Sequence, residues 1–401
     1  MAKKTIDKID VKGKRVLIRV DFNVPIEDGK ITDERRIREA LPTIKSVLER
    51  GGAVVLMSHL GRPSGKGYEA EYSLKPVATK LSELLGRPVA FPSTDLTDAA
   101  AEAAAKAAKP GDVVLLENVR FAKGEKKGDA DYASKLAGYG DVYCNDAFGT
   151  AHREDGSMFA VPKAMAGKPR VAGLLLQKEL VYLGDKLSNP AKPFCVILGG
   201  AKVSDKIELV ENLLPRADSI LIGGAMAYTF LAALGRKVGA SRVEHDHVAS
   251  AKKMLNQAAQ LKCDLHLPMD HVCSTEFHEM NGEKKTFTDH IGEGFMGLDI
   301  GPKTQQDYAA VIRKSKTIVW NGPMGVFEWF PFAVGTRMVA ESIVKATEAG
   351  ATSIVGGGDS AAAAEQFGLA SRFSHVSTGG GASLEMLAGK PFTTVALLDE
   401  A

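Results

Sequence analysis

The sequence is poor in the features that mark secreted, membrane-spanning or nucleic-acid-binding proteins. Its 401 residues include only four cysteines, scattered along the chain, which indicates a reducing compartment. No segment approaches the about 18 consecutive apolar residues of a membrane-spanning helix. The N-terminus, MAKKTIDKID, lacks the apolar stretch of a secretory signal. Basic residues (51) exceed acidic residues (49) by only two, which argues against a polyanionic partner. We therefore expect a soluble, cytoplasmic protein without nucleic-acid or membrane partners.

Short apolar runs recur along the whole chain and alternate with helical patterns. The helical patterns include residues 34–51, 96–108 and 205–217. The apolar runs lie at residues 15–22, 53–60, 112–121, 141–148, 194–201, 219–225, 264–270, 317–323, 352–358 and 373–381. Nearly continuous apolar strands separated by helices indicate parallel sheets covered on both faces. Because 401 residues exceed what one compact core accommodates, we predict an α/β fold of two Rossmann-like, doubly wound parallel-sheet domains.

One long amphipathic pattern, VAGLLLQKELVYLGDKLSN, occupies residues 171–189, and Pro190 and Pro193 follow it. We predict that this segment is a single interdomain helix without a strand and that it acts as the hinge. The predicted N-terminal domain therefore covers residues 1–170, and the predicted C-terminal domain covers residues 190–388.

Basic and polar residues gather where the apolar runs of the first half end. They are Arg19, Asp21, Asn23, Arg36 on the following helix, His59, Arg62, Arg120, His152 and Arg153. Ligands of doubly wound sheets bind beyond the carboxyl ends of the strands. Arginine makes bidentate contacts with phosphate and carboxylate groups. Any one of these residues alone could be a solvated surface group, but the set predicts a site for a small, multiply anionic substrate.

The apolar runs of the second half end in glycine instead. GGAKVSDK (199–206) places Lys202 and Lys206 at the start of a helix, where backbone amides, the helix dipole and two cations favour phosphate. Neither this stretch nor GRPSGKG (61–67) fits the Walker A pattern, GxxxxGK[ST].

Two further glycine clusters follow later strands. GGGDS (356–360) faces the end of the run TIVWNGP and includes Asp359, which can contact Mg²⁺. STGGGASLE (377–385) places three glycines before a helix and can form a backbone nest for an oxyanion. Each cluster alone could be a tight turn. On one sheet, the clusters together favour a nucleotide.

The stretch CDLHLPMDHVC (263–273) resembles a zinc site at first sight. Its spacing matches none of the common zinc patterns, and its alternation predicts a strand and the exit from that strand.

Eight longer motifs resemble the phosphoglycerate kinase family, in the family's order and over essentially the whole chain. They are RVDFNVP (19–25), SHLGRP (58–63), LLENVRF (115–121), NDAFGTAHR (145–153), GGAKVSDKI (199–207), WNGPMGVFEW (320–329), GGGDS (356–360) and TGGGASLE (378–385). The resemblance implies reversible phosphoryl transfer between 1,3-bisphosphoglycerate and MgADP, which gives 3-phosphoglycerate and MgATP. It also implies a monomer of two Rossmann-like domains.

The resemblance implies one binding site on each domain. For phosphoglycerate, the matching positions are Asp21, Phe22, Asn23, Arg36, His59, Leu60, Gly61, Arg62, Arg120 and Arg153. For the nucleotide, they are Gly199, Ala201, Lys202, Lys206, Gly223, Gly224, Gly297, Asn321, Pro323, Glu328, Gly357, Gly358, Asp359 and Ser360. Glu328 is expected to take the ribose hydroxyls, Asp359 to contact Mg²⁺, and Gly223, Gly224 and Gly297 to border the adenine.

The resemblance also implies which groups meet the transferring phosphoryl group. They are Arg36, Lys202, Lys206 and the amides of Gly379, Gly380 and Gly381. Such groups stabilise a transition state whose negative charge is spread over three oxygens. The implied tail, residues 389–401, is expected to return to the N-terminal domain. Because the two sites lie on different domains, closure about the hinge is expected to bring the substrates together.

The chain departs from the family pattern at two places. Glu154-Asp155-Gly156 follow Arg153, where the family usually has a small residue and a histidine. Ala225 stands where many members have a third glycine. Neither departure removes a chemical group assigned above.

Two other functions stay open on the sequence alone. A NAD-linked dehydrogenase would need a GxGxxG turn after the first strand and an acid about 20 residues further on, and the chain lacks this pattern. A non-catalytic nucleotide or phosphosugar sensor would be expected to have lost Arg36, Lys206 or Asp359, and all three are present.

Overall fold

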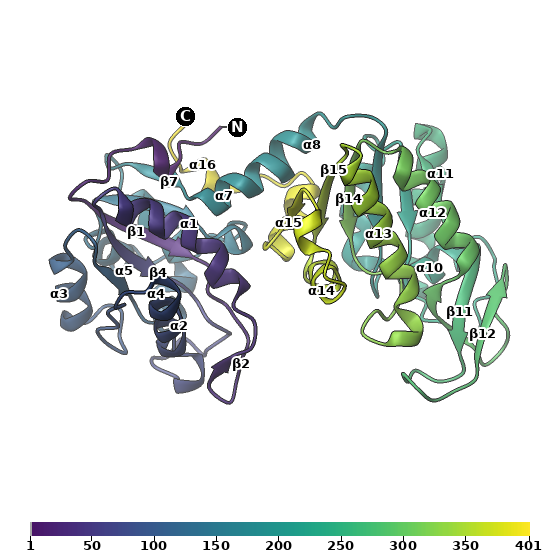
Figure 1. Ribbon diagram of the computed structural model, residues 1–401, viewed down its shortest axis with the longest axis horizontal. Coiled ribbons are helices and arrows are strands. Elements are labelled where there is room, and N and C mark those ends of the chain that lie inside the picture. Colours follow the sequence, from purple (N-terminus) through teal and green to yellow (C-terminus); the bar gives the residue numbers. More distant parts are fainter. Residues whose placement is uncertain (1) are drawn as a thin grey trace. The chain divides into compact units, whose positions relative to one another are not determined.

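The structure, a computed structural model, describes residues 2–401, which form two compact units (Figure 1). Unit 1 extends to Gly184 and resumes over Pro391–Ala401, whereas unit 2 is the continuous segment Asp185–Lys390. The division between the units therefore falls inside residues 171–189, the predicted connector.

Residues 174–188 are helical without a break, as predicted, but the segment begins with a strand, so the prediction that it contains no strand was wrong. The elements here are β7 (Arg170–Ala172), α7 (Leu174–Glu179), a π-helical turn (Leu180–Asp185) and α8 (Lys186–Ser188). Strand β7 pairs in parallel with β6 (Val142–Asp146). Three residues are too few to show the alternation by which a strand is recognised in a sequence.

Unit 1 is built on a five-stranded parallel sheet with the order β5-β4-β1-β6-β7. Its other strands are β1 (Arg15–Val20), β4 (Ala53–Met57) and β5 (Val113–Leu115), and β2 (Ile26–Glu27) and β3 (Lys30–Ile31) form a separate hairpin. The order reverses at β1, which pairs with β4 on one side and with β6 on the other. This is the predicted doubly wound arrangement, and its switch point lies at the carboxyl ends of β1 and β6.

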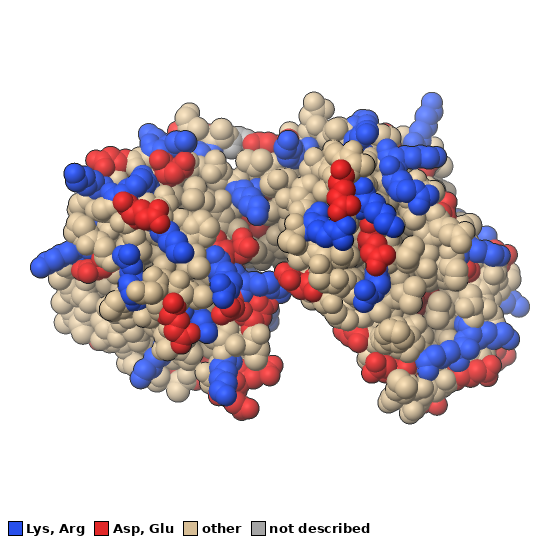
Figure 2. Space-filling model, in the orientation of Figure 1, with Lys and Arg blue, Asp and Glu red and all other residues tan. Residues whose placement is uncertain are grey.

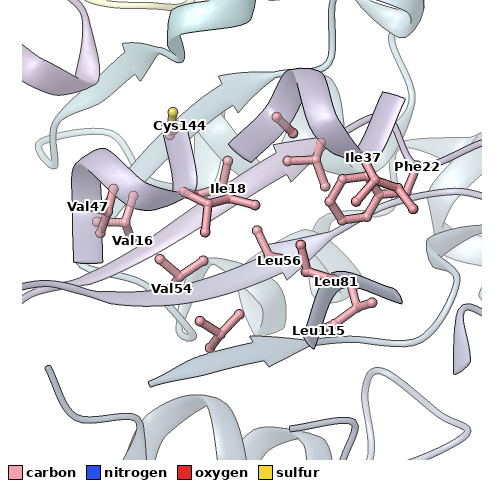
Figure 3. Packing of buried hydrophobic residues seen from close by; sticks show 14 of the residues in the cluster. Val16, Ile18, Phe22, Ile37, Val47, Val54, Leu56, Leu81, Leu115 and Cys144 are labelled. Atoms are coloured by element: carbon pink, nitrogen blue, oxygen red, sulfur yellow. The ribbon is translucent and has the colours of Figure 1, made fainter. Parts of the chain in front are cut away.

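Helices cover the sheet of unit 1 and complete its core. They are α1 (Arg35–Glu49), α2 (Lys75–Leu85), α3 (Ala99–Ala107), α4 (Lys123–Lys127), α5 (Ala130–Ala137), α6 (Val161–Ala164), α7 and α16 (Thr393–Ala396). Figure 3 shows part of this core, a single hydrophobic cluster that includes Ile18 of β1, Leu56 of β4 and Ile37 of α1. Each fully buried side chain of this size contributes about 1.5–3 kcal/mol to folding.

The segment that follows unit 2 is packed into unit 1. Phe392 lies beside Phe148, with ring centroids 6.0 Å apart, and the hydroxyl of Thr394 donates to the carbonyl of Ala151. Further along, the amide of Lys4 donates to the carbonyl of Asp399 at 2.8 Å. Both ends of the described chain are therefore part of the same unit.

Unit 2 is built on a six-stranded parallel sheet with the order β10-β9-β8-β14-β15-β16. Its strands are β8 (Phe194–Leu198), β9 (Ser219–Ile222), β10 (Asp264–His266), β14 (Thr317–Asn321), β15 (Thr352–Gly356) and β16 (His375–Val376). The helices are α9 (Ile207–Leu213), α10 (Met226–Ala233), α11 (Val248–Leu261), α12 (Pro302–Lys314), α13 (Val334–Glu348), α14 (Gly358–Gln366) and α15 (Gly381–Leu387). The order is that of a Rossmann sheet, with its switch point between β8 and β14.

Unit 2 also contains a small antiparallel sheet that the sequence did not predict. It consists of β12 (Lys284–Thr288), β11 (Asp270–Ser274) and β13 (Met296–Ile300), in that order. Four of the five residues of β12 are exposed. Such a polar strand carries little hydrophobic signal, because Phe287 is its only large apolar residue.

The charged surface agrees with the near-balanced composition. In Figure 2, acidic and basic side chains are interspersed over the visible face of each unit. Among the described residues, no helix combines the length and the apolar character that crossing a membrane requires.

Candidate functional site

At the switch point of unit 1, a buried carboxylate lies among basic side chains. Asp21 directly follows β1 and is 8 % exposed. Arg36, in the first turn of α1, donates from Nη1 to Asp21 Oδ2 at 2.8 Å. His59 follows β4, and its Nδ1 lies 3.8 Å from Asp21 Oδ1. The structure therefore brings these three predicted residues together.

Burial and arginine charges set the ionisation of this group. Burial alone raises the pKa of Asp21, but the basic side chains around it outweigh burial and lower the pKa below its usual value. Burial also lowers the pKa of His59 well below its usual value; the charge of Asp21 opposes this change, and the charge of Arg19 adds to it. His59 is therefore neutral near pH 7. Since a neutral His59 adds no charge, Arg36 and Arg19 are the groups that keep Asp21 ionised.

A chain of hydrogen bonds holds Arg120 at the same edge of the sheet. Arg120 donates from Nη1 to the carbonyl of Gly61 at 2.7 Å, and the amide of Gly61 donates to Asn23 Oδ1 at 2.8 Å. Burial lowers the pKa of Arg120, and the charge of Arg153 acts in the same direction. A bound anion would relieve this unfavourable surplus of positive charge, which fits the predicted acidic substrate.

Two buried residues that no sequence motif indicated hold Arg19 in place. Arg19 is fully buried; its Nε donates to Ser157 Oγ at 2.8 Å, and its Nη2 lies 3.4 Å from His59 Nδ1. Ser157 donates from Oγ to Glu125 Oε1 at 2.6 Å and from its amide to Glu125 Oε2 at 2.8 Å. Glu125 is also fully buried, which raises the pKa of its carboxyl group, while the charge of Arg19 lowers it. This network fixes the guanidinium group of Arg19 beside the imidazole of His59.

Arg62 and Arg153 lie less firmly fixed in unit 1. Arg62 is exposed, and Arg153 donates from Nε to His152 Nε2 at 3.2 Å. The acidic residue after Arg153 has a partner of its own, because Glu154 Oε1 accepts a hydrogen bond from Thr393 Oγ1 at 2.8 Å. Glu154, which departs from the family pattern, therefore binds the segment that follows unit 2.

The side chains of Phe22 and Leu60 do not belong to the site, although the sequence placed them there. Phe22 is fully buried and Leu60 is 4 % exposed, and both are part of the hydrophobic core of unit 1. Figure 3 shows the ring of Phe22 beside Ile37. Only the backbone of these residues remains to contact a ligand, and the amide of Phe22 already donates to Ser58 Oγ at 2.8 Å.

In unit 2, the ends of β8 and β14 approach each other through glycine. The amide of Gly199 donates to the carbonyl of Asn321 at 3.0 Å, and that of Gly200 donates to the carbonyl of Pro323 at 3.0 Å. A Cβ atom on Gly199 would lie 2.0 Å from the Pro323 carbonyl oxygen. Only glycine therefore permits this close approach.

A cavity of about 380 Å³, which we call the glycine cavity, opens at this edge. Predicted residues in its wall are Gly199, Ala201, Lys202, Lys206, Asn321, Gly357, Gly358, Asp359, Ser360, Gly380 and Gly381. Lys206 donates to Asn321 Oδ1, and Asn321 Nδ2 donates to the carbonyl of Gly356 at 2.8 Å. Burial lowers the pKa of Lys206 to about 8, against the opposing effect of Asp205 and Asp359. Two lysines and the amides of glycine turns suit this cavity to phosphate groups.

A second cavity, of about 470 Å³, adjoins the first and is mostly apolar. We call it the apolar cavity. The two cavities share Gly200, Ala201 and Asp359. Predicted residues in the wall of the apolar cavity are Ala201, Gly224, Gly297, Pro323, Glu328 and Asp359, whereas Tyr228, Arg242, Phe277, Met296, Leu298 and Val326 were not predicted. A Cβ atom on Gly297 would lie 1.8 Å from the Tyr228 hydroxyl, so a larger residue there would displace the cavity wall.

Two predicted glycines lie behind the cavities instead of in their walls. A Cβ atom on Gly223 would lie 2.3 Å from Met324 Sδ, so Met324 separates this glycine from the apolar cavity. The amide of Gly379 donates to Ser377 Oγ at 3.1 Å and is already engaged. Their neighbours in the sequence do line the cavities: Gly224 lies in the wall of the apolar cavity, and Gly380 and Gly381 lie in the wall of the glycine cavity.

Glu244 fixes the turn that carries the two lysines, and no motif indicated it. Its Oε2 accepts from the amides of Val203 and Ser204, and its Oε1 accepts from Ser204 Oγ at 2.7 Å. Its own amide donates to Thr229 Oγ1 at 3.1 Å. These bonds tie residues 203–204 to the segment that runs along the apolar cavity.

We expect Glu244→Gln to lower kcat/KM for the nucleotide about tenfold. The neutral glutamine weakens the hydrogen bonds that hold the turn, and a hydrogen bond to a charged group contributes about 1.5–3 kcal/mol. Steady-state kinetics with varied nucleotide measure this change. Glu211→Gln is the matched control, since Glu211 is an exposed residue paired with Lys253 and lies outside both cavities. A Glu244→Gln enzyme with the kinetics of the control would remove Glu244 from this role.

Within residues 2–401, no group of three or more His, Cys, Asp or Glu side chains is arranged to hold a metal ion. The segment 263–273 instead includes β10 and the start of β11, as its alternation predicted. Cys263 and Cys273 are buried free thiols. A divalent cation at Asp359, an exposed residue in the first turn of α14, would therefore need ligands from a bound nucleotide.

Comparison with known proteins assigns this geometry to one family. The family model for phosphoglycerate kinase matches residues 6–390. A relative named phosphoglycerate kinase from Rhodopirellula baltica is 56% identical over 404 residues, and the match covers 100% of both chains. The chain belongs to the phosphoglycerate kinase family. A relative from Trypanosoma congolense, named phosphoglycerate kinase, cytosolic, is 50% identical over 419 residues, with 99% of this chain and 98% of the relative covered.

The fold agrees with the family as well. The solved structure of phosphoglycerate kinase from Coxiella burnetii is 40% identical to this chain and has a TM-score of 0.88 against this structure. The match covers 98% of each chain. The recognition based on the eight motifs is thereby confirmed. Membership of the phosphoglycerate kinase family makes the chain a phosphotransferase with a carboxyl group as acceptor.

Proposed function

We propose that the chain catalyses the reversible transfer of a phosphoryl group from 1,3-bisphosphoglycerate to MgADP, with 3-phosphoglycerate and MgATP as products. The observation that carries this proposal is that each unit holds a site suited to one of the two substrates. Unit 1 holds a cluster of arginines around Asp21 and His59, and unit 2 holds a glycine-rich, lysine-bearing cavity beside an apolar one. An acidic three-carbon substrate suits the first site, and a nucleotide suits the second.

Unit 1 is proposed to bind the phosphoglycerate. Arg36 and Arg120 donate to the anionic groups, His59 contributes a neutral imidazole, and Asn23 and the backbone of Gly61 fix the orientation. Arg62 and Arg153 are proposed to add contacts when the substrate is present. Asp21 holds Arg36 in place through their ion pair of 2.8 Å.

Unit 2 is proposed to bind the nucleotide across the two cavities. The phosphates lie in the glycine cavity against Lys202, Lys206 and the amides of Gly380 and Gly381, and Asp359 contacts the Mg²⁺ ion that arrives with the nucleotide. The base and ribose occupy the apolar cavity, where Glu328 accepts from the ribose hydroxyls. The Mg²⁺ ion, when bound, neutralises phosphate charge.

The reaction needs no covalent enzyme intermediate. In the direction of acyl phosphate formation, a carboxylate oxygen of 3-phosphoglycerate attacks the γ-phosphorus of ATP. The bond from that phosphorus to the β–γ bridging oxygen breaks, and ADP leaves. Negative charge is spread over the three equatorial oxygens in the transition state, so the protein acts by positioning and by charge stabilisation. Arg36, Lys206 and the amides of Gly380 and Gly381 are proposed to supply that stabilisation.

We further propose that the protein works as a cytoplasmic monomer whose units move together when both substrates are bound. In-line transfer requires the reacting atoms to approach within about 3–3.5 Å, and the groups assigned to the two substrates belong to different units. The four free, buried cysteines fit a reducing compartment. Small-angle scattering tests the movement: a radius of gyration that stays constant with both substrates bound would contradict it.

A coupled assay tests the reaction itself. The enzyme receives 3-phosphoglycerate and MgATP, and glyceraldehyde-3-phosphate dehydrogenase reports the acyl phosphate through loss of NADH. We expect turnover that requires Mg²⁺. A folded protein that binds ATP but shows no turnover would favour the alternative, a non-catalytic sensor of nucleotide or phosphosugar.

A further inference from the structure

One buried carboxylate of unit 1 has no role in the proposed function. Glu125 of α4 is fully buried, and so is Arg19 of β1. Ser157 hydrogen-bonds both side chains, and Arg19 in turn contacts His59. A buried charge is costly unless its partners compensate for it. The network therefore connects a buried anion to the imidazole of the substrate site.

The direction of each hydrogen bond around Ser157 follows from the groups that make it. Arg19 can only donate, so Ser157 Oγ accepts from Arg19 Nε at 2.8 Å and turns its own proton to Glu125 Oε1 at 2.6 Å. The other carboxylate oxygen, Oε2, accepts from the amide of Ser157 at 2.8 Å and from the hydroxyl of Tyr132 at 3.2 Å. Glu125 thus accepts at both oxygens, as an ionised carboxylate does.

The same rule places the proton on the ring of His59. Arg19 Nη2 lies 3.4 Å from His59 Nδ1, and because a guanidinium group has no acceptor, Nδ1 must accept. Burial lowers the pKa of His59 and keeps the ring neutral near pH 7, so its one proton is on Nε2. Asp21 Oδ1 would instead require a proton on Nδ1, but it lies 3.8 Å from Nδ1, beyond hydrogen-bonding distance. The geometry therefore favours the Nε2–H tautomer.

The Nε2 edge of His59 is the edge that a ligand can use. His59 is 3 % exposed, and among residues 2–401 its Nε2 has no hydrogen-bond partner. A buried N–H without a partner costs free energy, and an oxygen of an anionic substrate would satisfy it. A lone pair at the same position would repel that oxygen. The tautomer of His59 thus decides whether the residue attracts or repels the substrate.

Loss of the charge on Glu125 would undo this arrangement. A glutamine at position 125 has a single acceptor oxygen, and its amino group would face a donor or take over the place to which Ser157 turns its proton. The buried charge of Arg19 would also lose its compensating anion. Both changes loosen Arg19 from His59 Nδ1, and Nδ1 then becomes free to donate to Asp21.

We propose that Glu125 is a positioning residue of the substrate site: through Ser157 and Arg19 it holds His59 in the tautomer that presents an Nε2–H donor to an anionic oxygen of the substrate. This inference rests on the proposed function, because it takes His59 as a residue of the phosphoglycerate site. Glu125 acts without touching the substrate, since it is fully buried.

The tautomer can be measured directly in the unmodified protein. Long-range proton–nitrogen correlation NMR spectra distinguish a protonated ring nitrogen from an unprotonated one. The spectrum of His59→Gln assigns the His59 signals among those of the nine histidines. Near pH 7 and without substrate, we expect a protonated Nε2 and an unprotonated Nδ1. A proton on Nδ1 in the wild type would overturn the proposal.

Glu125→Gln tests what holds the tautomer. We expect the His59 signals to shift towards a proton on Nδ1. KM for 3-phosphoglycerate should rise about tenfold, as for the loss of one hydrogen bond to a charged group, with kcat changed much less. Ser157→Ala removes the connecting hydroxyl and keeps both buried charges, so it should act in the same direction. Glu117→Gln is the matched control, because Glu117 is also buried but accepts from Ser73 Oγ at 2.6 Å, and it should leave the His59 signals unchanged.

The proposal requires both changes. Unchanged His59 signals or an unchanged KM in Glu125→Gln would overturn it, and so would equal changes in Glu117→Gln. If Glu125→Gln does not fold, Ser157→Ala and the spectrum of the wild type decide the question. Calorimetric titration with 3-phosphoglycerate repeats the comparison without turnover. If the wild type binds this ligand but shows no turnover, the proposed reaction fails, while the tautomer and the affinity still decide the role of Glu125.

Discussion

Arg36→Ala is expected to lower kcat for phosphoryl transfer by about 10²–10³, the usual loss when one donor to transition-state charge is removed. Arg36 sits in the first turn of α1 and donates to Asp21 at 2.8 Å. Its loss removes a cation from the substrate site and also leaves the buried Asp21 with one neighbouring charge fewer. In the unmodified protein the pKa of Asp21 is lowered, and it should therefore rise in the variant.

The coupled assay measures the kinetic change, and Arg35→Ala is the matched control. Arg35 is the neighbouring residue on α1, is exposed and pairs with Asp33 at 2.7 Å. A stability effect has a definite sign: a carboxylate whose folded pKa is lowered stabilises the fold above its unfolded pKa and loses this contribution as the pH falls through the folded pKa. Acid denaturation should thus begin at higher pH in Arg36→Ala. A near-normal kcat in Arg36→Ala would exclude Arg36 from transition-state stabilisation.

Lys206→Met is expected to lower kcat by a similar factor, about 10²–10³, because it removes the buried cation of the glycine cavity. Folding should not suffer. Burial lowers the pKa of Lys206 to about 8, so the charged lysine is a net cost to the fold below that pH, and methionine removes the cost. Thermal unfolding of the variant measures this, with Lys253→Met as the control at an exposed lysine. Normal kcat in Lys206→Met would exclude the assigned role.

The pH dependence provides a second view of Lys206. In the free enzyme its charge is lost as the pH rises through about 8, so nucleotide affinity should fall above that pH. Lys206→Arg keeps its charge over the whole range and should lose this alkaline limb. Calorimetric titration with ADP between pH 7 and pH 9 would show it. An alkaline limb that persists in Lys206→Arg belongs to another group.

The site could be predicted from the sequence where adjacent strands end together. Asp21 and His59 follow β1 and β4, which are neighbours in a parallel sheet, so the alternation of strands and helices was enough to place them at one edge. The same logic joined Gly199 and Asn321 at the ends of β8 and β14. The order of the strands could not show whether a residue contributes its side chain or only its backbone to the site. Phe22 lies within a recognised motif, yet its ring is in the core.

Other parts of the site depend on contacts that only the folded chain creates. Glu125 lies in the stretch GEKKGDAD, which has the composition of a solvated surface, but it is fully buried against Ser157. Glu244 lies between α10 and α11 in a segment without a recognised motif of its own. Its importance arises from its distant partners at residues 203–204, and no periodicity of the local sequence indicates such partners.

The packing of residues 391–401 into unit 1 has a consequence for biosynthesis. Unit 2 is continuous in sequence, whereas unit 1 is interrupted by the whole of unit 2. On the ribosome, residues 185–390 emerge before Phe392 and Thr394 can reach Phe148 and Ala151. Until those residues are made, unit 1 has an unfilled position beside the segment that carries Arg153. The segment that completes the substrate-binding unit is thus translated after the entire nucleotide-binding unit.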